Sequence, residues 1–279
     1  MSQHTEGTFT SSDGLSIYHQ AWLPSGDPRA VVMLIHGLGE HSGRYAHVAT
    51  TLNDAGLAVH ALDHRGHGKS DGKRVFVKSY DEFMTDLVQF RSLITAEHPD
   101  VPLIVLGHSM GGNLAVGHTL EHQAGITGLA LSGAALQVGS DLSPGKLKVF
   151  KLIAKIAPGV RPEGLSAEAI SRDPAVVSAY QNDPLVFTGK ISAGLGAALI
   201  EAMERFPQRY GELTLPLLIM HGTDDQLASV EGSRALEAAA VNAEVTARYY
   251  DGLYHEIFNE PEQDEVLADL VSWVDSVLA

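Results

Sequence analysis

The sequence predicts an α/β protein in which a mainly parallel central sheet is flanked by helices. Short apolar runs, of the kind expected for strands buried on both faces, alternate with segments of helical periodicity. Strands that alternate with helices form a parallel sheet that is covered on both sides. The alternation stops between residues 134 and 207, which read as helical, and resumes afterwards. We therefore predict a core of residues 1–133 and 208–279 and an inserted helical cap, or lid, of residues 134–207.

The individual elements follow from the pattern of apolar residues. Residues 16–23 alternate, which is typical of an edge strand, whereas residues 30–35 are apolar throughout. Between residues 79 and 97, apolar side chains at helical spacing predict a long amphipathic helix. Strands are expected at 16–23, 30–35, 58–62, 103–106, 126–131, 217–220 and 245–250. Helices are expected at 43–55, 79–97, 110–122, 230–240 and 262–278.

A glycine-serine turn follows the strand expected at 103–106. The residues Gly107-His108-Ser109-Met110-Gly111 form a G-x-S-x-G pattern between a strand and a helix, which is the setting of a nucleophile elbow. Such a turn strains the backbone of Ser109, and its two glycines let the strand and the helix approach closely. The pattern alone also fits an ordinary Gly-Ser turn before a helix, so the distinction between the two depends on residues elsewhere in the chain.

A serine is a useful nucleophile only if a base takes its proton and an acid orients that base. In α/β-hydrolases these residues follow one another as serine, acid and histidine. Here Asp224 and Asp225 follow the strand expected at 217–220, and His255 follows the strand at 245–250. Both positions lie at the carboxyl edge of the sheet, where open α/β folds build their sites. The order predicts an α/β-hydrolase fold, with one of the two aspartates facing the histidine because neighbouring side chains point to opposite sides.

Acyl transfer through a serine also needs two backbone N–H groups aimed at the developing oxyanion. Met110, directly after Ser109, is expected to supply one of them. Leu38, in the glycine-rich loop after residues 30–35, is expected to supply the other, and an ordinary flexible turn is the alternative for this loop. A site of this kind works without a cofactor and without a metal ion.

The composition argues against several other classes of protein. The chain of 279 residues has no cysteine, which excludes a disulfide, a thiolate metal site and a cysteine nucleophile. Its formal net charge of −15 at pH 7 argues against nucleic acid as a partner, since phosphate binding needs a basic surface. The polar N-terminal stretch does not look like a signal peptide, and no apolar run approaches the roughly 18 residues of a spanning helix. These features predict a soluble protein of the cytoplasm.

Six motifs together resemble those of monoacylglycerol lipases. They are HGLGEHSGRY (36–45), DHRGHGKSDG (63–72), GHSMGG (107–112), SRDP followed by YQNDPLV (171–186), HGTDD (221–225) and GLYHE (252–256). The resemblance covers nearly the whole chain. It implies that a monoacylglycerol is the substrate, and that its ester is hydrolysed to glycerol and a fatty acid through an acyl-enzyme. It also implies that the cap covers the site and admits the acyl chain.

The resemblance further assigns site residues. The implied triad and oxyanion residues are Ser109, Asp225, His255, Leu38 and Met110. Asp225, rather than Asp224, fills the last position of the H-G-x-x-D motif. The residues implied at the glycerol end of the pocket are Glu40, Arg44 and Tyr180. For Glu40 and Arg44 the alternative is an ion pair that only fixes the loop.

Two groups of histidines in the sequence suggest other chemistry. Residues 118–122 (HTLEH) match an H-x-x-E-H zinc-protease pattern, but they begin roughly 13 Å along the elbow helix from Ser109. His60, His64 and His67 also cluster, and we interpret them as structural.

A general carboxylesterase or thioesterase for short acyl groups is the nearest alternative enzyme. A non-catalytic ligand receptor on a hydrolase scaffold is the alternative from another class, against which the intact set of catalytic residues argues.

One segment of the cap runs against the charge of the whole chain. Residues 146–157 contain four lysines and no acidic residue. On a helix, three of these lysines share one side, while apolar residues, Phe150 and Ile153 among them, gather on another. Basic amphipathic helices of this kind lie at lipid surfaces, so we predict peripheral contact with a lipid surface through this segment. The alternative is that its apolar face simply packs against the rest of the protein.

Overall fold

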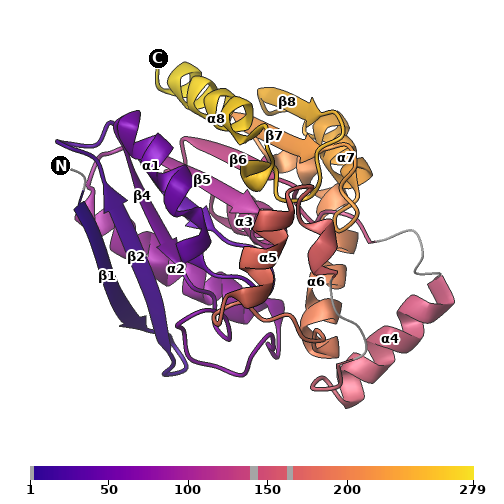
Figure 1. Cartoon of the computed structure of the whole chain (residues 1–279). Helices are drawn as coiled ribbons and strands as arrows, with labels where there is room; N and C mark the ends of the chain where they lie inside the picture. Colours follow the sequence, from indigo (N-terminus) through magenta and orange to yellow (C-terminus); the bar gives the residue numbers. More distant parts are fainter. Residues whose placement is uncertain (1–2, 139–143, 162–165) are drawn as a thin grey trace.

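A sheet of eight strands forms the centre of the computed structural model, which describes residues 3–138, 144–161 and 166–279 (Figure 1). The strands are β1 (Gln3–Thr10), β2 (Ser16–Leu23), β3 (Ala30–Ile35), β4 (Leu57–Leu62), β5 (Leu103–His108), β6 (Gly128–Ser132), β7 (Leu217–Gly222) and β8 (Val245–Tyr250). Their order in the sheet is β1-β2-β4-β3-β5-β6-β7-β8. The pairs β1–β2 and β2–β4 are antiparallel and all later pairs are parallel, which confirms the predicted fold class.

Helices cover both faces of this sheet. The helices of the described residues are α1 (Ala46–Asp54), α2 (Tyr80–Glu97), α3 (Met110–His122), α4 (Pro144–Ile156), α5 (Pro174–Asn182), α6 (Ala193–Arg205), α7 (Val230–Ala239) and α8 (Gln263–Leu278). Short 3₁₀ helices lie at Ser42–Tyr45, Ala167–Ala169, Phe206–Gln208, Tyr210–Glu212 and Ile257–Asn259. One apolar core joins the sheet to α2, α3 and α6, and the other joins it to α1 and α8. Along β3, Val31 and Met33 face the first core while Val32 and Leu34 face the second, which explains the unbroken apolar run.

The N-terminal strand β1 was not predicted, and its sequence explains why. QHTEGTFT is polar and mostly exposed, so it carries no buried apolar run or clean alternation. It is a strand because it pairs antiparallel with β2 along its whole length, from Gln3 opposite Leu23 to Thr10 opposite Ser16. Of its side chains, Phe9 packs against the core. Pairing with a neighbour, rather than its own pattern, determines this edge strand.

Between β6 and β7 the described residues form helices and turns that reach over the carboxyl edge of the sheet (Figure 1). Two backbone hydrogen bonds attach this insertion to the loops below it. The Phe187 N–H donates to the Gly39 carbonyl (2.7 Å), and the Glu256 N–H donates to the Ile170 carbonyl (2.8 Å). The insertion therefore contacts the loops that follow β3 and β8. None of the described helices is long and apolar enough to cross a membrane.

Helix α4 lies at the margin of the molecule and contacts α6 (Figure 1). Phe150 is half-buried there and packs against a small cluster that includes Ala154 and Ala197. The apolar side of the segment is therefore divided, because Phe150 faces α6 whereas Ile153 is 41% exposed. For Phe150 the structure therefore matches the alternative that the apolar side packs against the rest of the protein, whereas lipid contact through the exposed residues stays a prediction. The side chains of residues 146 and 147 lie outside the described residues.

Candidate active site

The turn between β5 and α3 requires glycine on both sides of Ser109. Ser109 has φ 55° and ψ −119°, a strained conformation that exposes its side chain at the end of the strand. A Cβ on Gly111 would lie 2.0 Å from the Ile35 carbonyl oxygen. A Cβ on Gly107 would lie 2.5 Å from the Gly111 carbonyl oxygen. The sequence pattern thus forms a sharp strand–turn–helix corner in which neither glycine position has room for a side chain.

Ser109, His255 and Asp225 form a continuous row of hydrogen bonds at the carboxyl edge of the sheet. His255 Nε2 is 2.8 Å from Ser109 Oγ, and His255 Nδ1 is 2.7 Å from Asp225 Oδ2. The residues come from the ends of three strands: Ser109 follows β5, Asp225 follows β7 and His255 follows β8. A hydroxyl whose proton can pass to an imidazole oriented by a carboxylate is an activated nucleophile.

The loop after β7 decides which of its two aspartates faces the histidine. Asp224 is exposed to solvent, whereas the side chain of Asp225 is fully buried. Asp225 Oδ1 accepts hydrogen bonds from the backbone N–H groups of Leu227 (2.8 Å) and Ala228 (2.9 Å). Its Oδ2 lies 3.1 Å from Nε2 of His221, a buried residue of β7 that the sequence analysis did not single out. These contacts fix the carboxylate plane against the His255 ring.

The charges of the row are set by burial and by its own members. Burial opposes ionisation of Asp225, but the imidazoles of His255 and His221 outweigh it and lower the pKa of this carboxyl. Burial favours neutral His255, but the Asp225 carboxylate outweighs it and raises the pKa of the imidazole. The centre of the His108 ring lies 4.8 Å from that of His255, with the ring planes tilted by 51°, and His108 Nδ1 shares a hydrogen bond with Ser132 Oγ (3.1 Å). Burial, with His255 nearby, lowers the pKa of His108 to about 3, so it adds no positive charge beside the base.

Two backbone N–H groups stand beside the serine. Met110 begins α3, where N–H groups are not used by the helix, and Leu38 lies in the loop after β3. Within the described part of the chain, neither N–H donates to a protein acceptor. The N–H of Gly37, the residue before Leu38, already donates to Glu40 Oε1 (2.6 Å). The loop after β3 therefore offers the Leu38 N–H, but not the Gly37 N–H, to the space in front of Ser109.

An ion-pair chain connects this loop to the histidine loop. The Glu40 carboxylate holds the Gly37 N–H and the Tyr45 hydroxyl (2.6 Å) with one oxygen and Arg44 Nη1 (2.7 Å) with the other. Arg44 in turn donates to both carboxylate oxygens of Glu256, at 2.6 and 2.7 Å. Burial opposes the charge on Glu40, but Arg44 and the other groups around the carboxylate together outweigh it and lower the pKa of Glu40. Glu256 was missed by the sequence analysis, although it directly follows His255.

A small cavity opens at the serine. Its lining residues are Gly37, Leu38, Glu40, His108, Ser109, Ser166, Ile170, Tyr180, Leu227, His255 and Glu256. Its volume is about 20 Å³, close to that of a single water site. The predicted residues Glu40 and Tyr180 thus line this space, whereas Arg44 lies behind them with its guanidinium 4.8 Å from the centre of the Tyr180 ring. A second cavity of the same size lies on the other side of Leu38 and Tyr180, lined by apolar residues that include Phe187 and Ile191.

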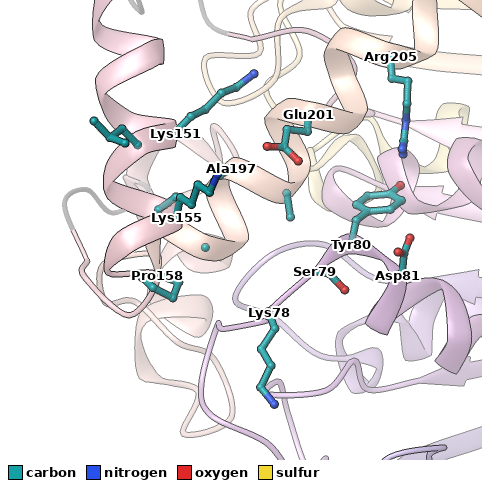
Figure 2. Close-up of a pocket in the computed structure, with 14 residues that line it drawn as sticks. Lys78, Ser79, Tyr80, Asp81, Lys151, Lys155, Pro158, Ala197, Glu201 and Arg205 are labelled. Carbon is teal, nitrogen blue, oxygen red and sulfur yellow. The ribbon is translucent and has the colours of Figure 1, made fainter.

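The largest cavity lies elsewhere and is not part of this site. It measures about 810 Å³ and lies between α4, α6 and the start of α2 (Figure 2). Lys78, Lys151, Lys155 and Arg205 line it together with the acidic residues Asp81 and Glu201. None of the residues in the Ser109 row lines it. Its size reflects the loose fit of α4 against the rest of the protein, and the chemistry is assigned to the smaller cavity because the nucleophile lies there.

Among the described residues, His36, His64 and His118 make no hydrogen bond to Ser109, His255 or Asp225. His118 is fully buried inside α3, and Glu121 of the same pattern pairs with Arg209. Among the described residues, this pattern does not bring three potential ligands together around one point. His36 and His64 form a buried pair in which the His64 N–H donates to His36 Nε2 (3.0 Å), and burial lowers the pKa of both imidazoles. These neutral side chains pack between the loops.

Known proteins resemble this chain over most or all of its length. The family model described as serine aminopeptidase, S33, matches residues 26–262. A monoacylglycerol lipase of Mycolicibacterium smegmatis is 46% identical over 277 residues, which is 99% of each chain. The crystal structure of a monoacylglycerol lipase from Paleococcus ferrophilus matches with a TM-score of 0.82 at 32% identity, over 99% of each chain. A thermostable carboxyl esterase from Bacillus coagulans, solved with glycerol, matches with a TM-score of 0.88 at 27% identity, also over 99% of each chain.

The fold and the family match define the class of this protein, which is a serine hydrolase with the α/β-hydrolase fold. At 46% identity over nearly its whole length, the chain belongs to the monoacylglycerol lipase family. The resemblance inferred from the six motifs is thereby confirmed.

Proposed function

We propose that this enzyme hydrolyses the ester bond of monoacylglycerols to glycerol and a fatty acid. The observation that carries the proposal is the row from Ser109 through His255 to Asp225, with hydrogen bonds of 2.8 and 2.7 Å. It occurs in a chain that is 46% identical to a protein named monoacylglycerol lipase. The row supplies acyl transfer, and the family membership supports the substrate class.

In the proposed mechanism His255 removes the proton from Ser109 as Oγ attacks the ester carbonyl. Asp225 keeps the imidazole in the right tautomer and stabilises its cationic form. The N–H groups of Leu38 and Met110 stabilise the tetrahedral oxyanion, and the protonated His255 then gives its proton to the leaving glycerol oxygen. A water molecule, activated by the same histidine, cleaves the acyl-enzyme. No step needs a cofactor.

The surroundings of the serine suggest where each end of the substrate lies. Glu40 and Tyr180 are the polar side chains nearest to the predicted glycerol end, and Arg44 supports both from behind. The cavity beyond Leu38 has an apolar lining, with Phe187 among its residues, which matches the chemistry of an acyl chain. Both cavities are too small for a fatty acyl chain, at about 20 Å³ each. We therefore expect the cap residues that line them to be displaced when substrate binds.

A substrate panel tests the proposal. The panel contains mono-, di- and triacylglycerols of several chain lengths, p-nitrophenyl esters and acyl thioesters of matched chains, with Ser109→Ala as the control. We expect the highest kcat/KM on a monoacylglycerol. Higher values on short esters or thioesters would instead identify a general carboxylesterase or thioesterase, an alternative supported by the match to a carboxyl esterase.

A receptor on a hydrolase scaffold is separated from an enzyme by acylation kinetics. A serine-directed phosphonate should label Ser109 stoichiometrically and abolish turnover in parallel. A chain that shows no burst of acylation and no turnover with any member of the panel would be a binding protein. The activated row of hydrogen bonds argues against that outcome.

We also propose that α4 contacts lipid surfaces, where the substrate resides. Its exposed apolar side chains are Val149, Leu152, Ile153 and Ile156, which are 41–76% exposed. Four lysines and no acidic residue lie between positions 146 and 157 of a chain whose formal charge is −15. Exposed apolar residues beside lysines fit the interface of an anionic membrane. The cytoplasmic location remains a prediction from the sequence.

A further inference from the structure

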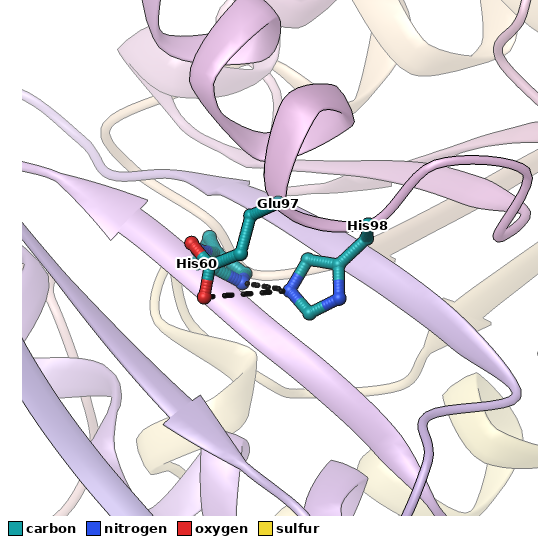
Figure 3. A group of neighbouring side chains, drawn as sticks. All are labelled: His60, Glu97 and His98. Atoms are coloured by element: carbon teal, nitrogen blue, oxygen red, sulfur yellow. Dashed lines mark hydrogen bonds and ion pairs between the residues drawn. The ribbon is translucent and has the colours of Figure 1, made fainter.

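A second convergence of polar side chains lies away from Ser109, where the last turn of α2 meets β4 (Figure 3). His60 is a buried residue of β4, Glu97 ends α2, and His98 is the residue that caps this helix. Helix α2 begins after the carboxyl end of β4 and returns the chain to the amino end of β5. Its last turn therefore lies at the amino edge of the sheet, opposite the carboxyl edge that carries the catalytic loops. The buried side chain of Ile94 holds this turn against the core.

The three side chains point at one another. Nε2 of His60 and Nε2 of His98 are 2.9 Å apart, and the two rings lie nearly perpendicular, at 77°. Glu97 Oε1 is 3.9 Å from Nε2 of His98. Among the residues that the structure describes, this is the one group in which three potential ligand atoms all lie within 4.8 Å of one another. In the sequence His60 clusters with His64 and His67, but the fold pairs it with His98 on another element.

We propose that His60, His98 and Glu97 form a binding site for a divalent transition-metal ion such as Zn²⁺ or Ni²⁺. Two imidazole nitrogens and one carboxylate suit these ions, whereas Mg²⁺ and Ca²⁺ prefer oxygen ligands alone. Metal–nitrogen bonds of about 2.0–2.1 Å at a tetrahedral angle separate two ligand nitrogens by roughly 3.3 Å. The two rings therefore need to part by only about 0.4 Å to admit an ion between them.

The accessibility of the group fits such an ion. The side chain of His98 is 11% exposed and that of Glu97 is 54% exposed, so the ion has a path from solvent and the carboxylate is free to rotate toward it. Three protein ligands leave the fourth, solvent-facing position to water. Because the ion would join the end of α2 to the middle of the sheet, we assign it a stabilising role. The site is independent of the Ser109 row.

Metal titration of the full-length protein tests the proposal. After chelator treatment and dialysis, calorimetry with ZnCl₂ and NiCl₂ should show one ion bound per chain, and MgCl₂ should show none. At an ion concentration of about 100 times Kd, linkage predicts that Tm rises by several degrees. Visible absorption of the Co²⁺-loaded protein should report tetrahedral coordination. These readouts do not depend on hydrolytic activity.

Substitutions locate the ion. His98→Gln keeps a polar side chain beside His60 and should weaken Zn²⁺ binding by about 100-fold or more, since altering even a hydrogen-bond partner of a metal ligand costs about 10–100-fold. Glu97→Gln alters an exposed side chain, so it should fold normally and weaken binding about tenfold. His122→Gln, at an exposed histidine of α3, is the matched control and should bind like the wild type. Absence of binding to the wild type, or equal affinity in the wild type and Glu97→Gln, overturns the proposal and identifies the histidine pair as a plain hydrogen bond.

Discussion

The loops around Ser109 and the cap helix α4 are attached to the protein by different kinds of contact. Around the serine, hydrogen bonds and buried ion pairs connect the loops that follow β3, β5, β7 and β8. Within its own length, helix α4 is attached to α6 by Phe150 and Ala154, which pack on small residues, and by an ion pair of Lys151 with Glu204. An exposed ion pair of this kind contributes little, about 0–1 kcal/mol. Backbone hydrogen bonds to the start of α6 come from Pro158 and Val160, after the helix has ended. The two regions therefore differ in how firmly their atoms are fixed.

This difference matches what each region has to do. Proton transfer between Ser109 and His255 depends on the separation of two atoms, and directional polar contacts fix such separations. Contacts between small apolar side chains carry no directional preference, so α4 can shift on α6 at low cost. We expect substitutions in the catalytic loops to change the chemical step. Substitutions on α4 should change only the encounter with lipid.

The largest effect is expected from Ser109→Ala. Removal of the nucleophile should lower kcat by a factor on the order of 10⁶, as in other serine hydrolases with a triad. The backbone at this position is strained with either residue, so the free energy of unfolding should change little. Hydrolysis of a monoacylglycerol and thermal unfolding measured on the same preparation check both statements. Residual activity of more than a few per cent would remove Ser109 from the mechanism.

The two neighbouring aspartates should behave very differently. Asp225→Asn keeps the acceptor for the Leu227 and Ala228 N–H groups but should lower kcat about 10⁴-fold, because the imidazole loses its tautomer and its charge partner. Asp224→Asn, at an exposed side chain, should stay within about twofold of the wild type. Similar activities of the two variants would contradict the role of Asp225.

The same pair of variants predicts a change in pH dependence. Hydrolysis needs neutral His255, so the rate falls as the pH drops through the pKa of this imidazole. Asp225 raises that pKa, and its removal should therefore lower the pKa and move the acid limb of kcat/KM to lower pH. Asp224→Asn should leave the acid limb in place. Profiles of kcat/KM against pH, measured on one soluble ester, compare the three proteins.

The sequence predicted those parts of the molecule that depend on local pattern. Continuous apolar runs identified most strands of the parallel sheet. The order of Ser109, an aspartate and His255 at strand ends indicated the candidate triad, and the H-G-x-x-D motif selected Asp225 over Asp224. The edge strand β1 could not be found, because its pairing with β2 comes from tertiary structure. Contacts across long sequence separations were equally hidden: Arg44 and Glu256 are 212 positions apart. Their pairing depends on how the two loops come together in the fold, and the local sequence of neither loop specifies its partner.

An intermediate effect is expected from the ion-pair chain, of which the sequence indicated the Glu40–Arg44 pair but not its link to Glu256. Arg44→Lys keeps the positive charge, but an ammonium group cannot donate in parallel to both oxygens of Glu256 while also donating to Glu40. The loop after β3, which contains Leu38, should therefore be held less firmly. We expect kcat/KM to fall about 10-fold, within the range of one or two weakened charged hydrogen bonds. A structural role lowers kcat/KM equally for a monoacylglycerol and for a p-nitrophenyl ester of the same acyl chain. A clearly larger loss on the monoacylglycerol would instead show contact with the glycerol end.

The smallest effect on chemistry, and the sharpest contrast with the catalytic loops, is expected on α4. Leu152 and Ile156 are 56% and 76% exposed, so changing both to serine should leave the fold and the hydrolysis of a short soluble ester unchanged. If α4 contacts lipid, the wild type should sediment with anionic vesicles, added salt should weaken this binding, and the double variant should lose it. Val241→Ser is the matched control for the double variant, since Val241 is also 76% exposed but lies outside the cap. Phe150 is not substituted, because it packs on α6 and its loss would disturb the attachment of α4 itself. Vesicle binding that persists in the double variant, or that disappears equally in the Val241 control, would contradict the proposal that α4 carries the lipid contact.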